Sequence, residues 1–442
     1  MRGLARISFT LVAGSVVVLL VVTAFIASSA VPFSTPASTQ SVSSISTEVP
    51  STRILTTAPA PSYIIAGGQE GSWFSSDQHP ELYKLSPDTD FSAASLVPVS
   101  GKGTVWSGGY NGSNWLITGW GSGKYLNPYI SLYNKTTTSK TRLGNYSEIG
   151  SEEQEWAGGD VFAVGWNGTD WLLTGMGSGY LPGLGLSNHM SMAVLSANGT
   201  FTDLSAQIPE QQDLILYANA WNENSSYWLV GGGWFGAPKG ALFVLSGDTI
   251  TNITSEIASA VPSFNSIQSI VWNGRYFLIG GVGFLAEYDG STFTDLTAQL
   301  DQALGNPSQM LSDVTDNAVN AIAWTGTYWL IGGGTPVAYD GPWSHGAWVV
   351  SLSQRSGEAA GDTSATIFTD LTSSVIPSSV LNDGGDSTIL TIFCSTSAGC
   401  AIGGSDSGFG ILLWYNGART TDLSATVNSS MSYVQWVGMP DE

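Results

Sequence analysis

The sequence predicts an all-β fold, and three observations support this. One phrase recurs along the chain: an aromatic residue, a turn rich in Asn and Gly, a hydrophobic stretch and a glycine pair, as in WNGRYFLIGG from Trp272. Its copies stand roughly 50 residues apart, which is typical of arrays of small repeated units. The repeat also lacks the helical period of apolar residues. Copies begin at Tyr110, Trp166, Trp221, Trp272 and Trp324, with a degenerate copy at Cys394 and a partial one anchored on Trp436.

The shortest copy shows the plan of one unit. We expect strands, named A to D in order, over Ser269–Trp272, Tyr276–Ile279, Leu285–Tyr288 and Thr292–Leu296. Asn273-Gly274 has the chemistry of a two-residue hairpin turn between the first two strands. Four short antiparallel strands per repeat are typical of a β-propeller blade.

The two ends of the repeat region complement each other. Tyr63–Gly68 reads as a strand B without a strand A, and Tyr433–Val437 reads as a strand A after which the sequence stops. Joined, they make one composite blade beside six internal ones, which leaves no sheet edge exposed. We therefore expect a seven-bladed β-propeller of four-stranded antiparallel blades over residues 62–442, with its last blade closed by the N- and C-terminal strands.

The blade pattern resembles the kelch repeat and the central propeller of the galactose-oxidase family. The shared marks are the pair Gly280-Gly281, the Tyr288-Asp289 dipeptide and an aromatic residue, Phe293, on the fourth strand. Kelch blades usually carry Trp at that last position, and the strand A pattern also departs from ordinary kelch, which indicates a divergent relative. The resemblance covers about Tyr63 to the end of the sequence. It implies the fold and leaves the function open.

The N-terminal 61 residues are expected to lie outside the propeller. Arg2 and Arg6 precede an uncharged apolar helix over Ile7–Val31, long enough to cross a bilayer. Ser28 and Ala30 also fit a signal-peptide cleavage site, so residues 1–31 are either a membrane anchor or a cleaved signal. Residues 32–61 are rich in Ser, Thr and Pro, as in an extended stalk. Both alternatives place the rest outside the cell, either membrane-anchored or secreted.

The charge balance excludes one class of partner. The 442 residues carry a net charge of −21, and only 11% of them are charged. Such a surface repels nucleic acid, and no basic stripe opposes the repulsion. We expect carbohydrate or protein partners at the cell surface, and contact with the membrane through the N-terminal segment only.

The two cysteines, Cys394 and Cys400, occupy the positions at which other blades carry an aromatic pair, such as Trp324 and Trp329. Residues facing each other across a hairpin have adjacent β-carbons, as a disulfide requires. An exported protein permits the bond. We expect a disulfide here, the alternative being a free or metal-binding pair.

Loop lengths divide the propeller into two faces. The A–B and C–D turns of one face are mostly tight, whereas the B–C and D–A loops of the other are long and varied, as binding loops are. Aromatic residues suited to sugar or peptide contact lie in the expected B–C loops. These candidate ligand-binding residues are Trp73, Trp120, Tyr180, Trp234 and Trp343. The alternative is that each ring folds back over its own blade.

Polar residues share a second position in these loops, shortly before the expected strand C. They are His79, Asn127, His189, Lys239 and His345. Three histidines invite a metal site, but strand C is third from the axis, which separates residues on non-adjacent blades too widely for one ion. We therefore expect loop capping or solvent exposure, with no metal and no cofactor. Calcium binding in D–A loops at Asp313 and Asp316, or at Asp383 and Asp386, is a weak alternative that turn chemistry explains equally.

Eight Asn-x-Ser/Thr sequons are candidate glycosylation sites. They are Asn111, Asn134, Asn145, Asn167, Asn198, Asn224, Asn252 and Asn428. Five lie in expected A–B or C–D turns, so glycans would cover the tight face and spare the loop face. Chance is the alternative, because Asn-Gly turns in a chain rich in Ser and Thr generate sequons.

Catalytic motifs are missing, which makes an enzyme the less favoured class. The repeated FTDLS and FTDLT phrases carry aspartates, but their recurrence in nearly every blade indicates hydrogen bonding at a strand end. No two acids pair convincingly as a glycosidase requires. We expect a binding or surface-assembly module acting through the loop face. The alternative is an extracellular carbohydrate-active enzyme, glycosidase- or lyase-like, using acidic residues on the same face.

Overall fold

The computed structural model divides the chain into two units, Met1–Arg53 and Ile54–Glu442, and everything described below belongs to the second. The structure describes residues 63–70, 79–85, 94–96, 103–121, 128–133, 138–139, 160–181, 185–209, 214–234, 239–305, 317–334, 346–354, 366–378, 387–396, 399–406, 409–427, 431 and 433–439. The expected N-terminal helix and stalk lie outside these residues. In the described part, no helix has the length and apolar character needed to span a membrane.

The described chain is mostly β, and its strands form four-stranded antiparallel sheets. The first sheet has the order β28 (Tyr433–Gly438), β1 (Ile64–Glu70), β2 (His79–Leu85) and β3 (Ala94–Leu96). The next contains β4 (Gly103–Tyr110), β5 (Trp115–Gly121), β6 (Pro128–Tyr133) and β7 (Thr138–Ser139). The third contains β8 (Asp160–Trp166), β9 (Asp170–Leu181), β10 (Gly185–Ser196) and β11 (Phe201–Asp203).

Two further sheets follow the same plan. One contains β12 (Ile215–Asn222), β13 (Tyr227–Gly233), β14 (Gly240–Ser246) and β15 (Thr249–Asn252). The other contains β16 (Ile267–Trp272), β17 (Phe277–Gly281), β18 (Phe284–Tyr288) and β19 (Phe293–Asp295). Its four strands overlap the four expected from the shortest repeat, which confirms that reading of the unit.

The last eight strands form two similar sets. The first comprises β20 (Ala318–Trp324), β21 (Trp329–Gly334), β22 (Trp348–Gln354) and β23 (Thr366–Asp370). The second comprises β24 (Ser387–Ser395), β25 (Gly399–Asp406), β26 (Phe409–Tyr415) and β27 (Thr420–Asp422). In the described strands, the two sets are joined by a single pair of residues between β21 and β24, Gly334 and Thr388.

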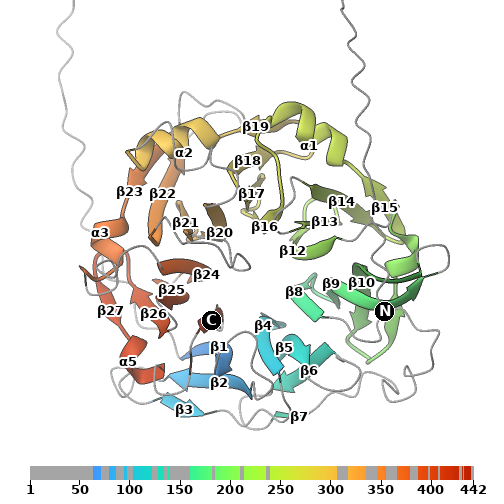
Figure 1. Cartoon of the computed structure of the whole chain (residues 1–442), viewed down its shortest axis with the longest axis horizontal. Helices are drawn as coiled ribbons and strands as arrows, with labels where there is room; N and C mark the ends of the chain where they lie inside the picture. Colours follow the sequence, from blue (N-terminus) through green and yellow to red (C-terminus); the bar gives the residue numbers. More distant parts are fainter. Residues whose placement is uncertain are drawn as a thin grey trace, which may run out of the picture. The chain divides into compact units, whose positions relative to one another are not determined.

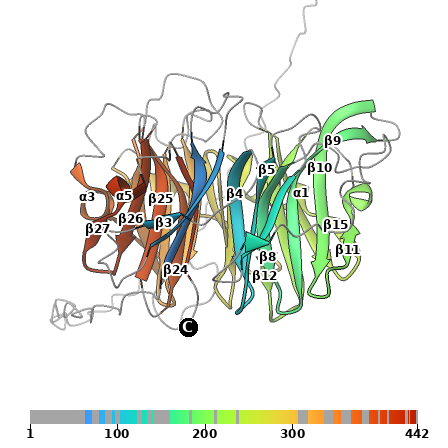
Figure 2. The same cartoon turned by 90° about the horizontal axis from the view of Figure 1, so that it is seen from below.

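The sheets of this unit are arranged around a common centre, with the first strand of each sheet innermost (Figure 1). Neighbouring innermost strands contact one another: β4 with β8, β8 with β12, β12 with β16, β16 with β20, β20 with β24, β24 with β28, and β28 with β4. Figure 2 shows β9 and β10 projecting beyond the ends of the other strands on one side. Each innermost strand begins at that end of the sheets, which is the expected loop face.

The aromatic that opens each repeat lies at or next to the end of strand A and faces a residue at or next to the start of strand B. Trp324 pairs with Trp329, and Trp166 pairs with Trp171, with ring centroids 5.0 and 4.7 Å apart. Cys394 and Cys400 pair in the same register and form a disulfide, which confirms the expected bond. A structural disulfide is typical of proteins from oxidising compartments.

The register corrects one assignment. Trp436 was expected to open the last repeat, but it pairs with Gly67 of the glycine pair. Gly438 pairs with Ile65, so Met439 stands where the other repeats carry their aromatic. The aromatic side chain at Trp436 misled the alignment, since the true position holds a methionine that is fully buried.

The repeated aspartates hold the end of strand D, as expected from the sequence. Asp295 accepts a hydrogen bond from the backbone N–H of Thr297 at 2.9 Å, and the Thr297 hydroxyl accepts one from the N–H of Leu285 at 3.2 Å. Four other sheets repeat this clamp. The first residues of those clamps are Asp203, Asn252, Asp370 and Asp422.

Short helices follow this clamp, and the sequence analysis did not predict them. They are η2 (Ser205–Gln207), α1 (Thr254–Ala260), α2 (Thr297–Ala303), α3 (Thr372–Val375) and α5 (Ser424–Val427). Each is too short for a helical period to be recognised in the sequence. Ile257 of α1, Leu300 of α2 and Val375 of α3 are fully buried, so these helices cover the outer ends of the hydrophobic layers.

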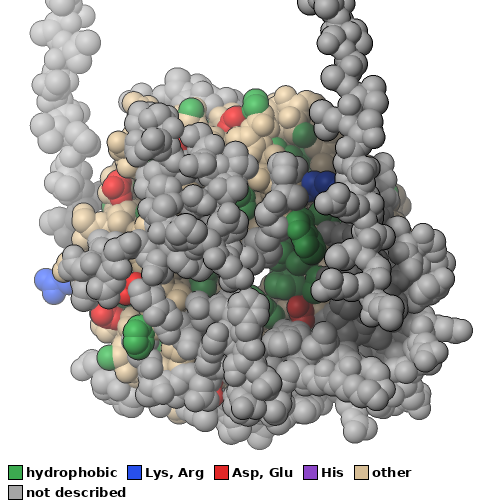
Figure 3. Space-filling model, viewed as in Figure 1, with side chains coloured by type: hydrophobic (Ala, Val, Ile, Leu, Met, Phe, Trp, Pro, Cys, Tyr) green, Lys and Arg blue, Asp and Glu red, His purple; other side chains and the backbone are tan. Residues whose placement is uncertain are grey.

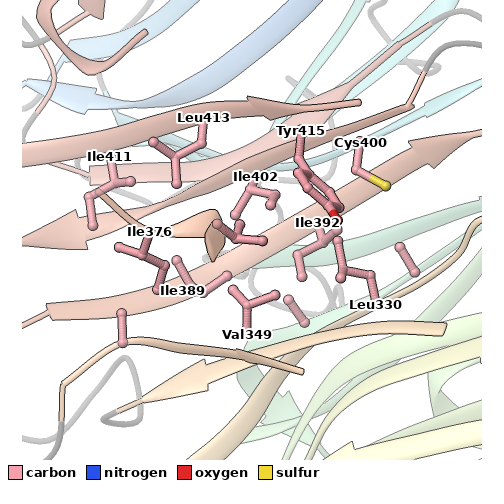
Figure 4. Packing of buried hydrophobic residues seen from close by; sticks show 14 residues of the cluster. Leu330, Val349, Ile376, Ile389, Ile392, Cys400, Ile402, Ile411, Leu413 and Tyr415 are labelled. Atoms are coloured by element: carbon pink, nitrogen blue, oxygen red, sulfur yellow. The ribbon is translucent and has the colours of Figure 1, made fainter. Parts of the chain in front are cut away.

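The core lies between adjacent sheets. Between β20–β23 and β24–β27, for example, Leu330, Val349 and Ile376 pack against side chains of the next sheet, among them Ile389 and Ile402 (Figure 4). All five residues are at most 1% exposed. Because each layer needs both neighbouring sheets, the stability of any one sheet depends on the next.

Candidate functional site

A β-bulge interrupts every described innermost strand at the same place. Its pairing with the second strand skips one residue, so that two residues oppose one. The skipped residues are Trp106, Phe162, Tyr217, Gln268, Asn320, Leu390 and Gln435. All seven lie within the first four residues of their strands, and therefore near the loop face.

The glycine pair of strand B makes room for this arrangement. A β-carbon on its second glycine, such as Gly232, would overlap the backbone carbonyl oxygen of Ile215, two residues before the bulge. A β-carbon on the first glycine, Gly231, would press against Ile267 of the next innermost strand. The pair therefore lets the bulged strand and the neighbouring sheet approach strand B closely.

The bulge residues connect neighbouring sheets. The rings of Trp106 and Phe162 lie 5.0 Å apart, and those of Phe162 and Tyr217 lie 5.1 Å apart edge to face. These rings form a continuous aromatic row across β4, β8 and β12, in the geometry that aromatic pairs prefer. Further round, the Asn320 amide nitrogen donates to the hydroxyl of Thr388 at 3.1 Å and the carbonyl of Ile389 at 3.2 Å.

Some of the bulge residues are aromatic and others carry amides. Trp106, Phe162 and Gln268 keep part of their surface exposed, whereas Tyr217 and Asn320 are buried. Figure 3 views the side on which the innermost strands begin, and it shows a hollow near the centre lined by hydrophobic side chains with an acidic group beside them. We call the aromatic row, together with Asp160 at the start of β8, the inner rim.

The inner rim includes one carboxyl group, that of Asp160. Asp160 is the first residue of β8, two positions before Phe162. Burial raises the pKa of its carboxyl group from 3.8 to about 7. The pKa of the Tyr217 hydroxyl is raised well above its ordinary value, mainly by burial and next by the charge of Asp160. The two groups therefore influence each other electrostatically. Perturbed carboxyl groups beside exposed aromatic surface are typical of functional sites.

We expect Asp160 to make the protein less stable as the pH rises from about 4 to about 7. The folded state holds the Asp160 proton up to a pKa of about 7, whereas the unfolded chain releases it near 3.8. The unfolded state therefore binds fewer protons in this range, and stability falls with pH until it levels off above about 7. The two pKa values set an upper bound of about 4 kcal/mol on this loss.

The measurement is urea unfolding of the wild type and of Asp160→Asn at pH 4.5, 6 and 8. Other acids titrate in both proteins, so the difference between the two isolates Asp160. The wild type should lose stability relative to the variant between pH 4.5 and 8, and a difference independent of pH would contradict the raised pKa.

The expected loop aromatics fall into three groups. Trp234 follows the end of β13 and is 37% exposed. Its backbone N–H donates to the Lys239 carbonyl at 3.1 Å. Trp120 and Tyr180 belong to β5 and β9, so placing them in loops was wrong. In both sheets strands B and C pair beyond the glycine that ends the repeated phrase, as in Trp120 with Pro128 and Tyr180 with Leu186. Trp73 and Trp343 lie outside the described residues.

The polar candidates lie partly in strands, partly in a loop and partly outside the described residues. His79 opens β2 and His189 lies within β10, which corrects their expected place before strand C. His189 is fully buried, so solvent exposure was wrong for it. Lys239 is exposed in a loop before β14, as expected. Asn127 and His345, like the four aspartates weighed for calcium (Asp313, Asp316, Asp383 and Asp386), lie outside the described residues. In the described part, no three His, Cys, Asp or Glu side chains are grouped to hold a metal ion.

Four of the five described sequons occupy the expected turns. Asn111 and Asn167 lie in A–B turns, where their Oδ1 atoms accept backbone hydrogen bonds, and Asn198 lies in a C–D turn. Asn224 lies in the β12–β13 turn and its Nδ2 donates to the Gly274 carbonyl at 2.7 Å. Asn252 belongs to the strand D clamp. Asn134, Asn145 and Asn428 lie outside the described residues, and occupancy remains a prediction at every sequon.

The sequence analysis missed the inner rim, although a signal for its bulge residues was present. Six of them stand four residues before the aromatic or cysteine that closes strand A, for instance Phe162 before Trp166 and Tyr217 before Trp221. Gln435 has the same offset from Met439. No such signal marked Asp160. The residues at its position in other repeats, such as Thr104, Ile215 and Ala318, share no chemical character with it.

Comparison with known proteins adds little to this geometry. No protein-family model matches the chain, and no curated protein matches its sequence. Among solved structures, the Pyrococcus horikoshii acylaminoacyl peptidase aligns with a TM-score of 0.43 and 9% identity, over 83% of this chain and 52% of that one. The β-propeller domain of the Trilobed protease from Pyrococcus furiosus aligns with a TM-score of 0.41 and 8% identity, over 83% of this chain and 98% of that one.

Prolyl oligopeptidase B from Galerina marginata gives a TM-score of 0.43 and 10% identity, over 86% of this chain and 52% of that one. The chain thus spans about half the length of the two peptidases. With such low identities and TM-scores we draw nothing about activity from them. The propeller-like arrangement rests on the chain's own four-stranded sheets.

Proposed function

We propose that residues 62–442 form a closed seven-bladed β-propeller of divergent kelch-like type. Support comes from seven sets of four strands among the described residues and from the circular order of contacts between their innermost strands. The antiparallel pairing of β28 with β1 supports closure by the two ends of the domain. The glycine pairs and the Tyr288-Asp289 dipeptide support the kelch-like assignment.

The proposed function of this propeller is recognition at the cell surface, through the loop face. The disulfide and the apolar N-terminal segment support an exported protein, anchored or secreted. The inner rim and the amide beside it carry the functional proposal. The inner rim has partly exposed aromatic rings and a carboxyl group with a pKa of about 7, and the amide of Gln268, at the equivalent bulge of β16, is also partly exposed.

Carbohydrate is the ligand class that this chemistry fits best. Aromatic rings offer a flat apolar surface to a sugar ring, while amide and carboxyl groups bond its hydroxyls. The net charge of −21 disfavours acidic polysaccharides, so neutral or basic glycans are the expected partners. The same face would serve surface assembly if the glycan belongs to a neighbouring cell-surface molecule.

A glycan array with the purified full chain tests this function. We expect binding of neutral or basic glycans, weakened about fivefold or more by Trp106→Ala and by Trp234→Ala, since loss of an aromatic anchor costs more than about 1 kcal/mol. Ile367→Ala is the matched control, because Ile367 is 47% exposed on β23, away from the inner rim. Equal binding by all three variants would refute the loop-face site.

A second candidate is a carbohydrate-active enzyme at the same rim. One observation favours it: a carboxyl group with a pKa of about 7 can act as a general acid near neutral pH. Asp160→Asn should then abolish hydrolysis in a polysaccharide screen while weakening glycan binding less than Trp106→Ala does. Binding without any hydrolysis by the wild type supports the recognition function.

A further inference from the structure

A cavity lies on the tight-turn face, between the sheet β8–β11 and the sheet β12–β15. Its volume is about 360 Å³. Trp171, Trp221 and Trp228 contribute to its walls, and Asp170 and Asp248 add two carboxylates. Trp171 and Trp228 are 3% and 5% exposed, so their rings belong to the core and the cavity is built on a rigid base.

A sequon stands at this cavity. Asn167, in the turn between β8 and β9, contributes to its lining and begins the sequence Asn167-Gly168-Thr169. The Asn167 Oδ1 atom accepts hydrogen bonds from the N–H and hydroxyl of Thr169, each at 2.9 Å, and from the N–H of Asp170 at 2.7 Å. These three bonds fix the side-chain amide and leave its Nδ2, the atom that carries an N-glycan, without a partner in the described structure.

The chemistry of the cavity matches a sugar attached there. Sugar rings pack their apolar faces on indole rings, and their hydroxyls donate to carboxylates. Trp221 and Trp228 lie 5.2 Å apart at the far side, on the sheet next to the one that carries Asn167. Asp248, in the β14–β15 turn, is exposed and free to meet a hydroxyl.

We propose that the first sugars of an N-glycan on Asn167 occupy this cavity and join the two sheets. The inference rests on the export that the proposed function assumes, and it is independent of what the loop face binds. Asn224 on the neighbouring turn is a contrasting case, because its Nδ2 donates to the Gly274 carbonyl at 2.7 Å and so already joins two sheets without a glycan.

The test compares Thr169→Ala with Thr200→Ala, each removing one sequon from the same sheet while its asparagine remains. Thr200→Ala is the matched control, because Asn198 is exposed in the β10–β11 turn and does not line the cavity. The full chain is produced both in a eukaryotic secretory host and in a host without N-glycosylation. Comparing the two hosts removes the effect of the lost threonine itself.

Glycopeptide mapping should find Asn167 occupied. Thr169→Ala should lower the Tm by on the order of 2 °C more in the glycosylated protein than in the unglycosylated one, and Thr200→Ala should show no such excess. This additional loss of Tm should persist when every glycan is trimmed to a single N-acetylglucosamine. It should be smaller in a protein that also carries Asp248→Ala. An unoccupied Asn167, or equal Tm losses for the two sequon variants, would overturn the proposal, and neither result would bear on glycan binding by the loop face.

Discussion

Deletion of residues 433–442 is expected to abolish cooperative thermal unfolding and to expose the propeller to proteases. The deletion removes β28, which pairs with β1 and packs against both β4 and β24. Val434, Trp436 and Val437 are each at most 7% exposed, so their loss opens two hydrophobic layers at once. It also leaves β1 with an unpaired edge, which favours aggregation.

A point variant separates the contribution of packing from that of the missing strand. The Trp436 ring lies 5.4 Å from that of Trp115 in an edge-to-face contact. Removing a buried indole leaves a cavity, so Trp436→Ala should cost about 3–5 kcal/mol in urea unfolding. Trp234→Ala, which removes a 37% exposed indole, is the control and should cost far less. If the deletion leaves the Tm and protease resistance unchanged, the closed ring has to be abandoned.

The sequence predicted the features that local pattern specifies. Asn273-Gly274 and the aromatic pairs marked the A–B hairpins, and their spacing placed Cys394 opposite Cys400, as the structure confirms. The fourth strand and its aspartate clamp followed from the same repetition. These predictions succeeded because each depends on residues close together in one hairpin or one strand end.

The features that the sequence did not predict depend on contacts between sheets. The pKa of Asp160 is raised by burial, which sequence spacing cannot measure. The rings of Phe162 and Tyr217 meet only because β8 and β12 are adjacent. Tyr180 was placed in a loop because Gly175 was taken as the end of strand B, whereas β9 continues to Leu181. Short helices such as α3, four residues long, leave no period to detect.

Gly232→Ala is expected to destabilise the protein by about 3 kcal/mol or more, the upper range for overpacking a core. A β-carbon at this position would overlap the backbone carbonyl of Ile215 and press against the α-carbon of Leu216. Backbone atoms cannot move aside as the end of a side chain can. The bulge at Tyr217 would have to flatten or shift, which changes the inner rim as well as the core.

Two other glycine variants calibrate this result in urea unfolding. Gly231→Ala meets only the side chains of Ile267 and Ile270, which can adjust, so its cost should be smaller. Gly199→Ala meets nothing within 4 Å, and its φ of +86° should cost only about 1 kcal/mol. If Gly232→Ala costs no more than Gly199→Ala, close approach of the bulged strand is not what requires the glycine. If the expected order holds, the glycine pair and the bulge are one structural unit, and the aromatic row of the inner rim depends on a buried glycine of strand B.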